Sequence, residues 1–323
     1  MKNFVLLPAR SLEEAARETA KPKTELKAGG VDLVERIKEG TDAPERVVSI
    51  AHLPGLDGIE IGAPSRIGAL ATLAAIARHP EVRRVYPALA HAAEGAATPQ
   101  IRNMATLGGN ICQRPRCWYY RLEEFNCRKN GGKDCYAKEG ENRLHAIFDT
   151  DLLCVCVHPS ATAVALMAYR ADLEIVAPSG RKKIAIDDLF VRPANDATRE
   201  TRLAAGEIIQ TVVVPAPTAG TRSAYRKLKE KESFDWPLVE VCVAADLSHG
   251  SIREPRVVLG HVAQTPWRSK EAEAVLAGQR PTPEIFRKAA DAAVAGARPL
   301  AQNAFKVRLA RVTLERTLKD AFA

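Results

Sequence analysis

The spacing of apolar residues changes several times along the chain and predicts alternating helices and strands. Residues 11–19, SLEEAARET, have helical spacing, and Ser11 followed by Glu14 is a capping-box signature. Residues 25–40 predict a strand that passes through Gly29-Gly30 into a helix from Val31. Further helices are expected at 67–80, 87–96, 158–171, 284–297 and 303–322, and strands at 47–53, 58–63, 173–178, 182–186, 207–217, 223–247 and 255–262.

These elements predict an α+β protein with more than one domain, since 323 residues exceed the size at which one core keeps growing. Pro, Gly and small residues cluster at 215–220, PAPTAG, which is typical of a linker. We expect a first domain over residues 1–216, with two subdomains that meet near residue 53, and a second α+β domain over residues 221–323.

Composition narrows the function classes. Hydrophobic residues make up 46% of the chain, but no apolar run approaches twenty residues, so no membrane span is expected. The net charge is +8, yet the basic residues are scattered among 39 acidic ones without a basic run, which argues against nucleic-acid binding. The positive balance better suits acidic partner subunits or an anionic cofactor.

A cysteine-rich stretch between Cys112 and His158 lacks a regular period over most of its length. Its candidate ligands are Cys117, Cys127, Cys135 and Cys154, with nine, seven and eighteen residues between them. A long irregular loop inside a compact domain needs something to organise it, and thiolates bound to a metal or an iron-sulfur cluster supply that organisation.

Other interpretations of the cysteines stay open at this point. Disulfides are disfavoured because the N-terminus lacks the long apolar core of a signal peptide, so a reducing compartment is the default. Structural zinc sites pair cysteines two to four residues apart, and none of the four has such a partner among the other three, so 4Fe-4S is favoured over zinc. Cys156 and Cys242 lie in apolar, strand-like runs and are expected in the core. Cys156 is expected to face away from Cys154.

Two glycine pairs, Gly29-Gly30 and Gly108-Gly109, follow segments expected to be extended. A missing side chain lets backbone N–H groups approach an anion, so a diphosphate could be held between the pairs. The chain contains neither GxGxxG nor GxxxxGK[ST], so a Rossmann site and a P-loop are both unsupported.

Four segments carry a family resemblance. AGGVDL at 28–33, TPQIRNMATLGGN at 98–110, HPSATAVAL at 158–166 and GHVAQTPWR at 260–268 resemble, in order, signature segments of the FAD-binding medium subunits of molybdenum hydroxylases, the xanthine dehydrogenase and carbon monoxide dehydrogenase family. The cysteine insertion over 112–156 is most similar to the FAD and 4Fe-4S subunit of bacterial three-subunit aldehyde oxidoreductases, with 4-hydroxybenzoyl-CoA reductase as the alternative.

The resemblance implies a two-subdomain FAD-binding fold of the vanillyl-alcohol-oxidase-like type with a 4Fe-4S insertion. It implies cluster ligation by Cys117, Cys127, Cys135 and Cys154. It places Lys227 and Asp235 near the flavin, with Lys231 where an arginine is commoner, and departs from the family at Ala161, where an aspartate is usual. The implied FAD contacts are Ala28, Gly29, Gly30, Val31, Asp32, Thr106, Gly108, Gly109, Asn110, Ser160, Ile209, Lys227 and Asp235.

The implied function is electron transfer within a larger enzyme. A large subunit would hold the molybdenum cofactor and a small subunit two 2Fe-2S clusters, with an acceptor such as ferredoxin beyond FAD. A stand-alone flavoprotein oxidase and a zinc-holding structural subunit are the alternatives from other classes. The cytoplasm is the expected location, with the periplasm as the alternative if a partner with a twin-arginine signal carries the chain across.

Overall fold

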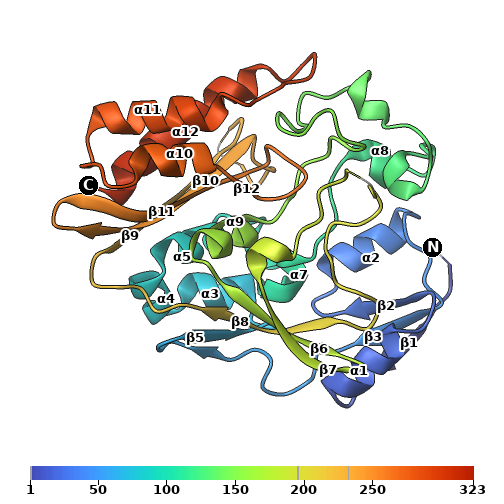
Figure 1. Ribbon diagram of the computed structural model, residues 1–323. Coiled ribbons are helices and arrows are strands. Elements are labelled where there is room, and N and C mark those ends of the chain that lie inside the picture. The colour runs from blue at the N-terminus through green and yellow to red at the C-terminus, as the bar shows by residue number, and fades with distance from the viewer. Residues whose placement is uncertain (1, 195, 232) are drawn as a thin grey trace.

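The computed structural model describes residues 2–194, 196–231 and 233–323 and contains three β-sheets, each with its own helices (Figure 1). The first sheet is parallel, in the order β1-β3-β2. Its elements are β1 (Val5–Pro8), α1 (Leu12–Thr19), β2 (Thr24–Lys27), α2 (Val31–Lys38) and β3 (Arg46–Ser49).

The two helices of this unit cover opposite faces of the sheet because successive residues of β3 point to opposite sides. Val47 packs with Leu33 and Ile37 of α2, whereas Val48 packs with the α1 residues in a core shared with the second sheet. Ser11 caps α1 as predicted, accepting from the Glu14 N–H at 3.1 Å. The Glu14 carboxylate accepts from the Arg10 N–H at 2.7 Å.

The second sheet has five strands in the order β4-β5-β8-β6-β7, all paired antiparallel. The strands are β4 (Ile59–Glu60), β5 (Ser65–Gly68), β6 (Asp172–Ala177), β7 (Gly180–Ala185) and β8 (Ile208–Val214). The helices of this unit are α3 (Leu73–Arg78), α4 (Pro80–Val85), α5 (Pro87–Glu94), α6 (Pro99–Met104), α7 (Leu107–Ile111) and α9 (Ala161–Ala168). A 3-10 turn covers Ile186–Asp188. The largest core of the molecule lies between this sheet, α3, α5 and α9.

One helix of this unit begins later in the structure than the sequence predicted. Residues 67 and 68 belong to β5, and α3 starts only at Leu73, where the Thr72 hydroxyl caps it by accepting from the Ala75 N–H. The predicted end is confirmed, since α3 stops at Arg78 and Pro80 begins α4.

The third sheet is antiparallel, in the order β12-β11-β10-β9. Its strands are β9 (Thr221–Leu228), β10 (Val239–Ser248), β11 (Ser251–Gly260) and β12 (Trp267–Arg268). Helices α10 (Lys270–Leu276), α11 (Pro283–Val294) and α12 (Phe305–Ala321) form a second large core with it. The other side of the sheet faces α5 and α9 (Figure 1).

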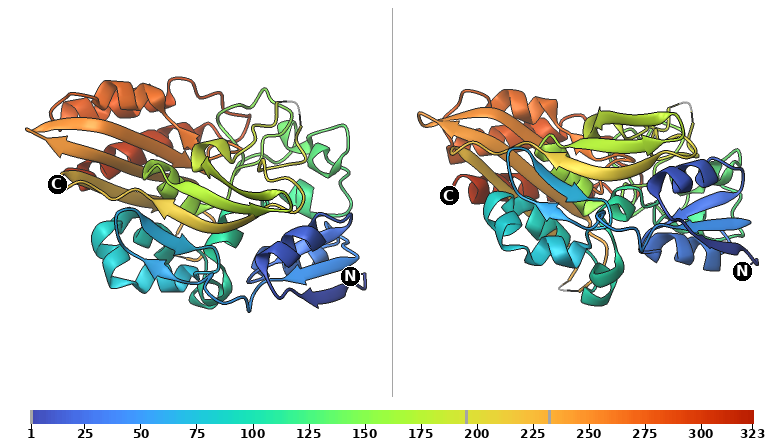
Figure 2. Two further views of the ribbon diagram at one scale, coloured as in Figure 1. Left: turned by 60° about the horizontal axis from the view of Figure 1, so that its bottom comes forward. Right: turned by 90° about the horizontal axis from the view of Figure 1, so that it is seen from below.

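The insertion is mostly irregular, as expected, with the short helix α8 (Trp118–Arg121) and 3-10 turns at Arg128–Asn130 and Tyr136–Lys138. Cys154 and Cys156 lie in extended loop, not in the expected strand. Both views of Figure 2 keep the N-terminal unit at the opposite end of the molecule from the C-terminus.

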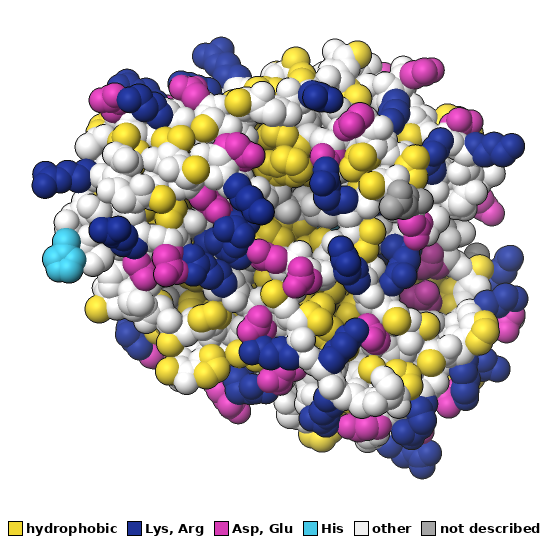
Figure 3. Space-filling view, in the orientation of Figure 1, with side chains coloured by type: hydrophobic (Ala, Val, Ile, Leu, Met, Phe, Trp, Pro, Cys, Tyr) yellow, Lys and Arg dark blue, Asp and Glu magenta, His cyan; other side chains and the backbone are white. Residues whose placement is uncertain are grey.

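The surface carries both signs of charge. On the face in Figure 3, Lys and Arg side chains are interspersed with Asp and Glu, and hydrophobic side chains are exposed between them. Within the described ranges, no helix has the length and apolar character needed to cross a membrane.

Candidate functional site

A cleft of about 950 Å³ lies where the three units meet. Its walls come from β2 and α2, from the segment around α6 and α7, from β8, and from the chain between β9 and β10. The volume is at the upper end of the range usual for ligand sites and suits a large ligand. All but one of the residues expected to contact FAD line this cleft: Ala28, Gly29, Gly30, Val31, Asp32, Thr106, Gly108, Gly109, Asn110, Ile209, Lys227 and Asp235.

The first glycine pair joins β2 to α2 as the pattern predicted. Gly30 is the N-cap of α2 with φ of +82°, a left-handed conformation that favours glycine. A Cβ atom on Gly29 would lie 1.9 Å from the backbone oxygen of Met104. The turn therefore packs directly on the end of α6, and both glycines are required by the backbone.

The second glycine pair follows a short extended segment, as expected, but lies in a helix. Ala105 and Thr106 are extended, and Gly108 and Gly109 then lie in the first turn of α7, whose N-cap Thr106 accepts from the Gly109 N–H at 3.2 Å. A Cβ on Gly109 would meet only the Thr106 hydroxyl, at 3.0 Å. Gly109 thus has little protein against it on the cleft side, where a ligand could approach the backbone.

Ser160 is the expected contact that does not line the cleft. It is fully buried at the N-cap of α9, and its hydroxyl donates to Oδ1 of Asn110 at 2.8 Å. The Thr162 hydroxyl donates to the same oxygen at 2.6 Å. These two bonds assign the amide orientation of Asn110, which does line the cleft. The sequence placed Ser160 beside the ligand, whereas the structure places it behind Asn110.

Lys227 and Asp235 belong to the C-terminal domain and line the cleft from that side. Lys227 donates from Nζ to the Gly95 carbonyl at 2.8 Å, and burial lowers the pKa of its ammonium, with Glu240 opposing that shift. Asp235 accepts from the Ser233 hydroxyl at 2.5 Å. Lys231 is exposed and is not part of the cleft wall, so only one of the two lysines reaches the site.

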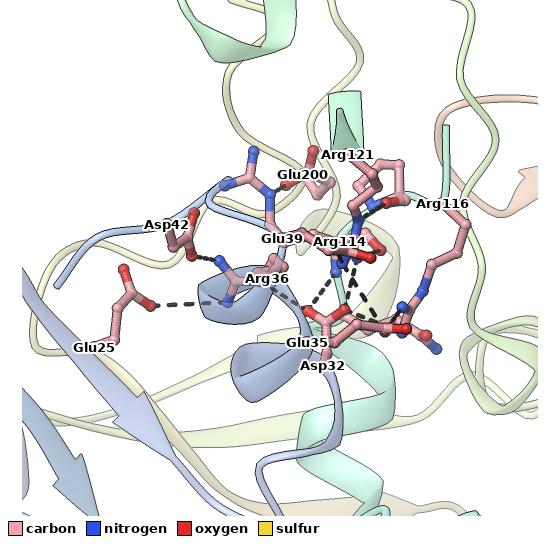
Figure 4. Close-up of polar contacts among 12 residues, drawn as sticks. Glu25, Asp32, Glu35, Arg36, Glu39, Asp42, Arg114, Arg116, Arg121 and Glu200 are labelled. Carbon is pink, nitrogen blue, oxygen red and sulfur yellow. Dashed lines mark hydrogen bonds and ion pairs between the residues drawn. The ribbon is translucent and has the colours of Figure 1, made fainter. Parts of the chain in front are cut away.

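Asp32 stands at the centre of an ion-pair network between α2 and the insertion (Figure 4). Its carboxylate lies 3.1 Å from Arg36, 3.1 Å from Arg116 and 2.8 Å from Arg121. Burial alone would raise the pKa of Asp32, but these arginines outweigh it and hold the pKa below its ordinary value. The other members of the network are Glu25, Glu35, Glu39, Asp42, Arg114 and Glu200. Sequence reasoning missed this network because its partners are about eighty residues apart.

A second, smaller cavity lies inside the insertion and is lined by cysteines. Its volume is about 10 Å³, and the four predicted ligands Cys117, Cys127, Cys135 and Cys154 all line it. Cys156 lines it too, so the expectation that Cys156 faces away from Cys154 was wrong. Residues two apart point to the same side even in a strand, and this segment is a loop. Cys242 is fully buried in β10 and packs in the core as expected.

The cysteine thiols influence one another. Hydrogen bonds from the thiols of Cys135 and then Cys156 lower the pKa of Cys154, and the nearby Lys129 contributes. Burial raises the pKa of Cys117 to about 12, and hydrogen bonding to Cys154 raises that of Cys135. Cys154 is therefore more inclined than Cys117 or Cys135 to be a thiolate, the form that binds metal.

Two further side chains beside the cysteines escaped the sequence analysis. Lys129 is buried, and its Nζ donates to Glu200 at 2.5 Å and to the Ala197 carbonyl at 2.7 Å. Nε2 of His145 lies 3.2 Å from Sγ of Cys117. Burial lowers the pKa of His145 to about 4, so this imidazole is neutral at pH 7.

Among the described residues, no group of three or more His, Cys, Asp or Glu side chains is arranged to hold one metal ion. The cysteines instead surround a cavity from several sides. In a 4Fe-4S cluster each cysteine binds a different iron, so its ligands do not converge on a single point.

Comparison with known families decides the identity of the fold. Residues 2–217 match the family model for the FAD binding domain in molybdopterin dehydrogenase, and residues 223–321 match the CO dehydrogenase flavoprotein C-terminal domain. The chain is an FAD-binding medium subunit of the molybdenum hydroxylase family. It is the FAD subunit of an oxidoreductase of that type, in which the substrate chemistry takes place on a partner subunit.

Individual relatives extend over nearly the whole chain. It is 34% identical over 328 residues to the aldehyde oxidoreductase FAD-binding subunit PaoB of Escherichia coli (strain K12), covering 100% of this chain and 99% of PaoB. It is 29% identical to the carbon monoxide dehydrogenase medium chain of Hydrogenophaga pseudoflava, covering 92% and 89%. A solved structure of carbon monoxide dehydrogenase from that organism superimposes with a TM-score of 0.78 at 28% identity, covering 99% and 98%. The fold is therefore the mixed α/β FAD-binding fold of that medium chain.

Proposed function

We propose that this medium subunit transfers electrons within a molybdenum-dependent aldehyde oxidoreductase, using FAD and a 4Fe-4S cluster. Electrons would arrive from 2Fe-2S clusters on a small subunit and leave for an external acceptor such as ferredoxin, while aldehyde oxidation takes place at the molybdenum cofactor of a large subunit. Similarity to the PaoB subunit along the whole chain favours the aldehyde class. The observation that carries the proposal is that the four cysteines selected from the sequence line one cavity.

FAD would occupy the large cleft. When bound, it connects one-electron carriers with two-electron donors or acceptors. The residues present fit it: Gly109 leaves the cleft side of α7 open, Asn110 has a fixed amide, and Lys227 brings a positive charge. We assign the diphosphate to the turn at Gly29-Gly30 and to the first turn of α7 at Gly108-Gly109, and the flavin ring to the side of Lys227 and Asp235. Two subdomains, meeting near residue 53, would hold the cofactor in the manner of vanillyl-alcohol-oxidase-like flavoproteins.

The cluster would occupy the cysteine cavity, held by Cys117, Cys127, Cys135 and Cys154. Cys154 is chosen over Cys156 as the fourth ligand because it stands four residues before His158, the position that the family resemblance implies. Lys129 would place a buried cation beside the cluster's negative charge. The limits of the two family matches support the proposed division into domains at 1–216 and 221–323.

Two measurements test the proposal. The full chain, purified anaerobically with the subunits that accompany it, is analysed for flavin, iron and acid-labile sulfide and by electron paramagnetic resonance. The complex is then assayed with aldehydes and with aromatic acyl-CoA substrates. We expect one FAD, four irons and aldehyde turnover by the complex only. Zinc in place of iron, or aldehyde turnover by the lone chain, would refute the proposal.

A further inference from the structure

The insertion forms part of the wall of the large cleft. Three of its residues line that cleft, namely Cys112, Gln113 and Arg116. Arg116 directly precedes Cys117, which lines the cysteine cavity. The two candidate cofactor sites are thus separated by a single peptide bond of the chain, and any change in the order of the insertion reaches the cleft.

Asp32 is the residue on which the insertion acts. It lies in the first turn of α2, lines the cleft and is largely buried, with 15% of its side chain exposed. Of the groups that neutralise its carboxylate, only Arg36 belongs to α2. The insertion supplies all the others: Arg116, Arg121 and the Arg114 N–H, which donates to Oδ2 at 3.1 Å.

The insertion also fixes these arginines in place. Arg121 is buried, and its Nε donates to the Pro115 carbonyl at 2.8 Å while a terminal nitrogen lies 2.9 Å from Glu39 of α2's C-cap. The Arg116 guanidinium stacks 5.1 Å from the centroid of the Trp236 ring, which lines the same cleft. Arg121 does not line the cleft, so it can affect a ligand there only through Asp32 and its neighbours.

A carboxylate in the wall of a site for an anionic diphosphate repels the ligand unless it is neutralised. Here the neutralising groups come mostly from the segment that carries the cysteines. Because ligand binding and local folding are coupled in metal sites, loss of a cluster would loosen that segment and release Arg116 and Arg121 from Asp32.

We propose that the insertion controls FAD retention through Asp32: the loaded insertion holds its arginines on this carboxylate, and removal of the cluster exposes the negative charge to the FAD diphosphate. This coupling rests on the proposed function, since it requires FAD in the cleft. Thermodynamic reciprocity requires that FAD binding strengthen cluster retention by the same factor. Asp32 and Arg121 are positioning residues in this scheme.

The test measures FAD affinity by fluorescence titration of the deflavinated full chain, before and after the cluster is stripped with an oxidant and a chelator. Stripping is expected to weaken FAD binding by about 5- to 150-fold, the usual range for two linked sites. In Asp32→Asn, which removes the charge and keeps the shape, the affinity should change less than twofold on stripping.

A second arm needs no cluster. Arg121→Met should weaken FAD binding, Arg121→Lys should restore part of the affinity, and the double variant Arg121→Met, Asp32→Asn should bind FAD like Asp32→Asn alone. Arg143→Met is the matched control, because this insertion arginine is paired with Glu230 outside the network, and FAD affinity should be unchanged.

The outcomes separate this inference from the proposed function. If the chain binds FAD but never contains iron, the cluster assignment and the coupling of cluster to FAD both fail, and the Arg121 variants then show only whether Asp32 affects FAD binding. FAD affinity that is the same in stripped and loaded protein, or that falls equally in Asp32→Asn, overturns the coupling. A chain that binds no FAD overturns both.

Discussion

The Ser160 hydroxyl donates a hydrogen bond to Oδ1 of Asn110, 50 residues earlier in the chain, and so joins the N-terminus of α9 to the end of α7. The same hydroxyl accepts from the Ala163 N–H at 3.0 Å, and the Thr162 hydroxyl is the second donor to Asn110. One buried serine therefore caps a helix and orients a side chain of the cleft.

These two roles can be separated by mutation. Ser160→Ala removes the helix cap and one bond to Asn110, so the free energy of unfolding should fall by about 1–2 kcal/mol and FAD should bind more weakly. Thr162→Val removes the other bond to Asn110 and leaves the cap. It should weaken FAD binding to a similar degree, with a smaller loss in the free energy of unfolding. FAD titration and urea unfolding measure the two effects. Unchanged FAD affinity in both variants would show that the orientation of Asn110 is irrelevant to the ligand.

The two glycine pairs should respond differently to a methyl group. Gly29→Ala places Cβ against the Met104 carbonyl, so it should destabilise the fold, lowering the urea midpoint as well as flavin content. Gly109→Ala meets only the Thr106 hydroxyl, at 3.0 Å, so the protein should fold with a smaller loss of midpoint than Gly29→Ala and lose FAD affinity. Gly109→Val should be folded and flavin-poor. Full flavin occupancy in Gly109→Val would show that the diphosphate does not bind at this position.

Lys306 is a buried clamp between the C-terminal domain and the end of the insertion. From α12 its Nζ donates to the carbonyls of His261 at 2.6 Å, His145 at 2.8 Å and Leu144 at 3.2 Å. Lys306→Met should lower the free energy of unfolding by about 1–3 kcal/mol or more, because it leaves buried carbonyls without a donor. Lys319→Met, which loses only an exposed pair with Glu315, is the control and should change the urea midpoint little. Equal midpoints for both variants would contradict the clamp.

The sequence predicted local structure correctly where the residues of one continuous segment determine it. The Ser11 cap, the strand-turn-helix at Gly29-Gly30 and the stop before Pro80 were all predicted, because the spacing and capping residues are contiguous. Strand β1 was missed because Val5 and Leu6 lie at a sheet edge and are more than half exposed, which hides any buried face. The extended segment before Gly108-Gly109 was predicted, but the short helix that holds the pair was not, because glycine disfavours a helix.

Interactions between distant segments could not be predicted from the sequence. The arginines of the insertion gave no pattern, since their meaning depends on Asp32 more than eighty residues earlier. Cys156 was wrongly expected to face away from Cys154, although residues two apart lie on the same side of a strand and both cysteines here occupy a loop. The four predicted ligands nevertheless line one cavity, because their irregular setting already set them apart from core cysteines.

The network around Asp32 should make the free energy of unfolding depend on pH in the acidic range. The arginines hold the pKa of Asp32 below its ordinary value, so its contribution to stability is present above about pH 4 and is lost as the pH falls through the lowered pKa. At pH 7, Asp32→Asn should be less stable by about 1.5–3 kcal/mol, the range for hydrogen bonds to charged groups. Urea midpoints of the two proteins should converge as the pH is lowered from 6 to 3. A constant difference would show that folding does not shift the pKa of Asp32.

Serine substitutions at each cysteine should identify the cluster ligands. Cys117→Ser, Cys127→Ser, Cys135→Ser and Cys154→Ser should each lose or convert the 4Fe-4S signal in electron paramagnetic resonance, with iron content falling in parallel. Cys242→Ser is the control, since this residue is buried in β10 and does not line the cysteine cavity, and it should keep the cluster.

Cys156→Ser tests which cysteine is the fourth ligand, because Cys156 lines the cavity beside Cys154. We expect it to retain the cluster with an altered signal, since it loses a thiol that hydrogen-bonds to Cys154. Loss of the cluster in Cys156→Ser together with retention in Cys154→Ser would show that Cys156, not Cys154, is the fourth ligand. Retention in all five variants around the cavity would show that no cluster binds at this site.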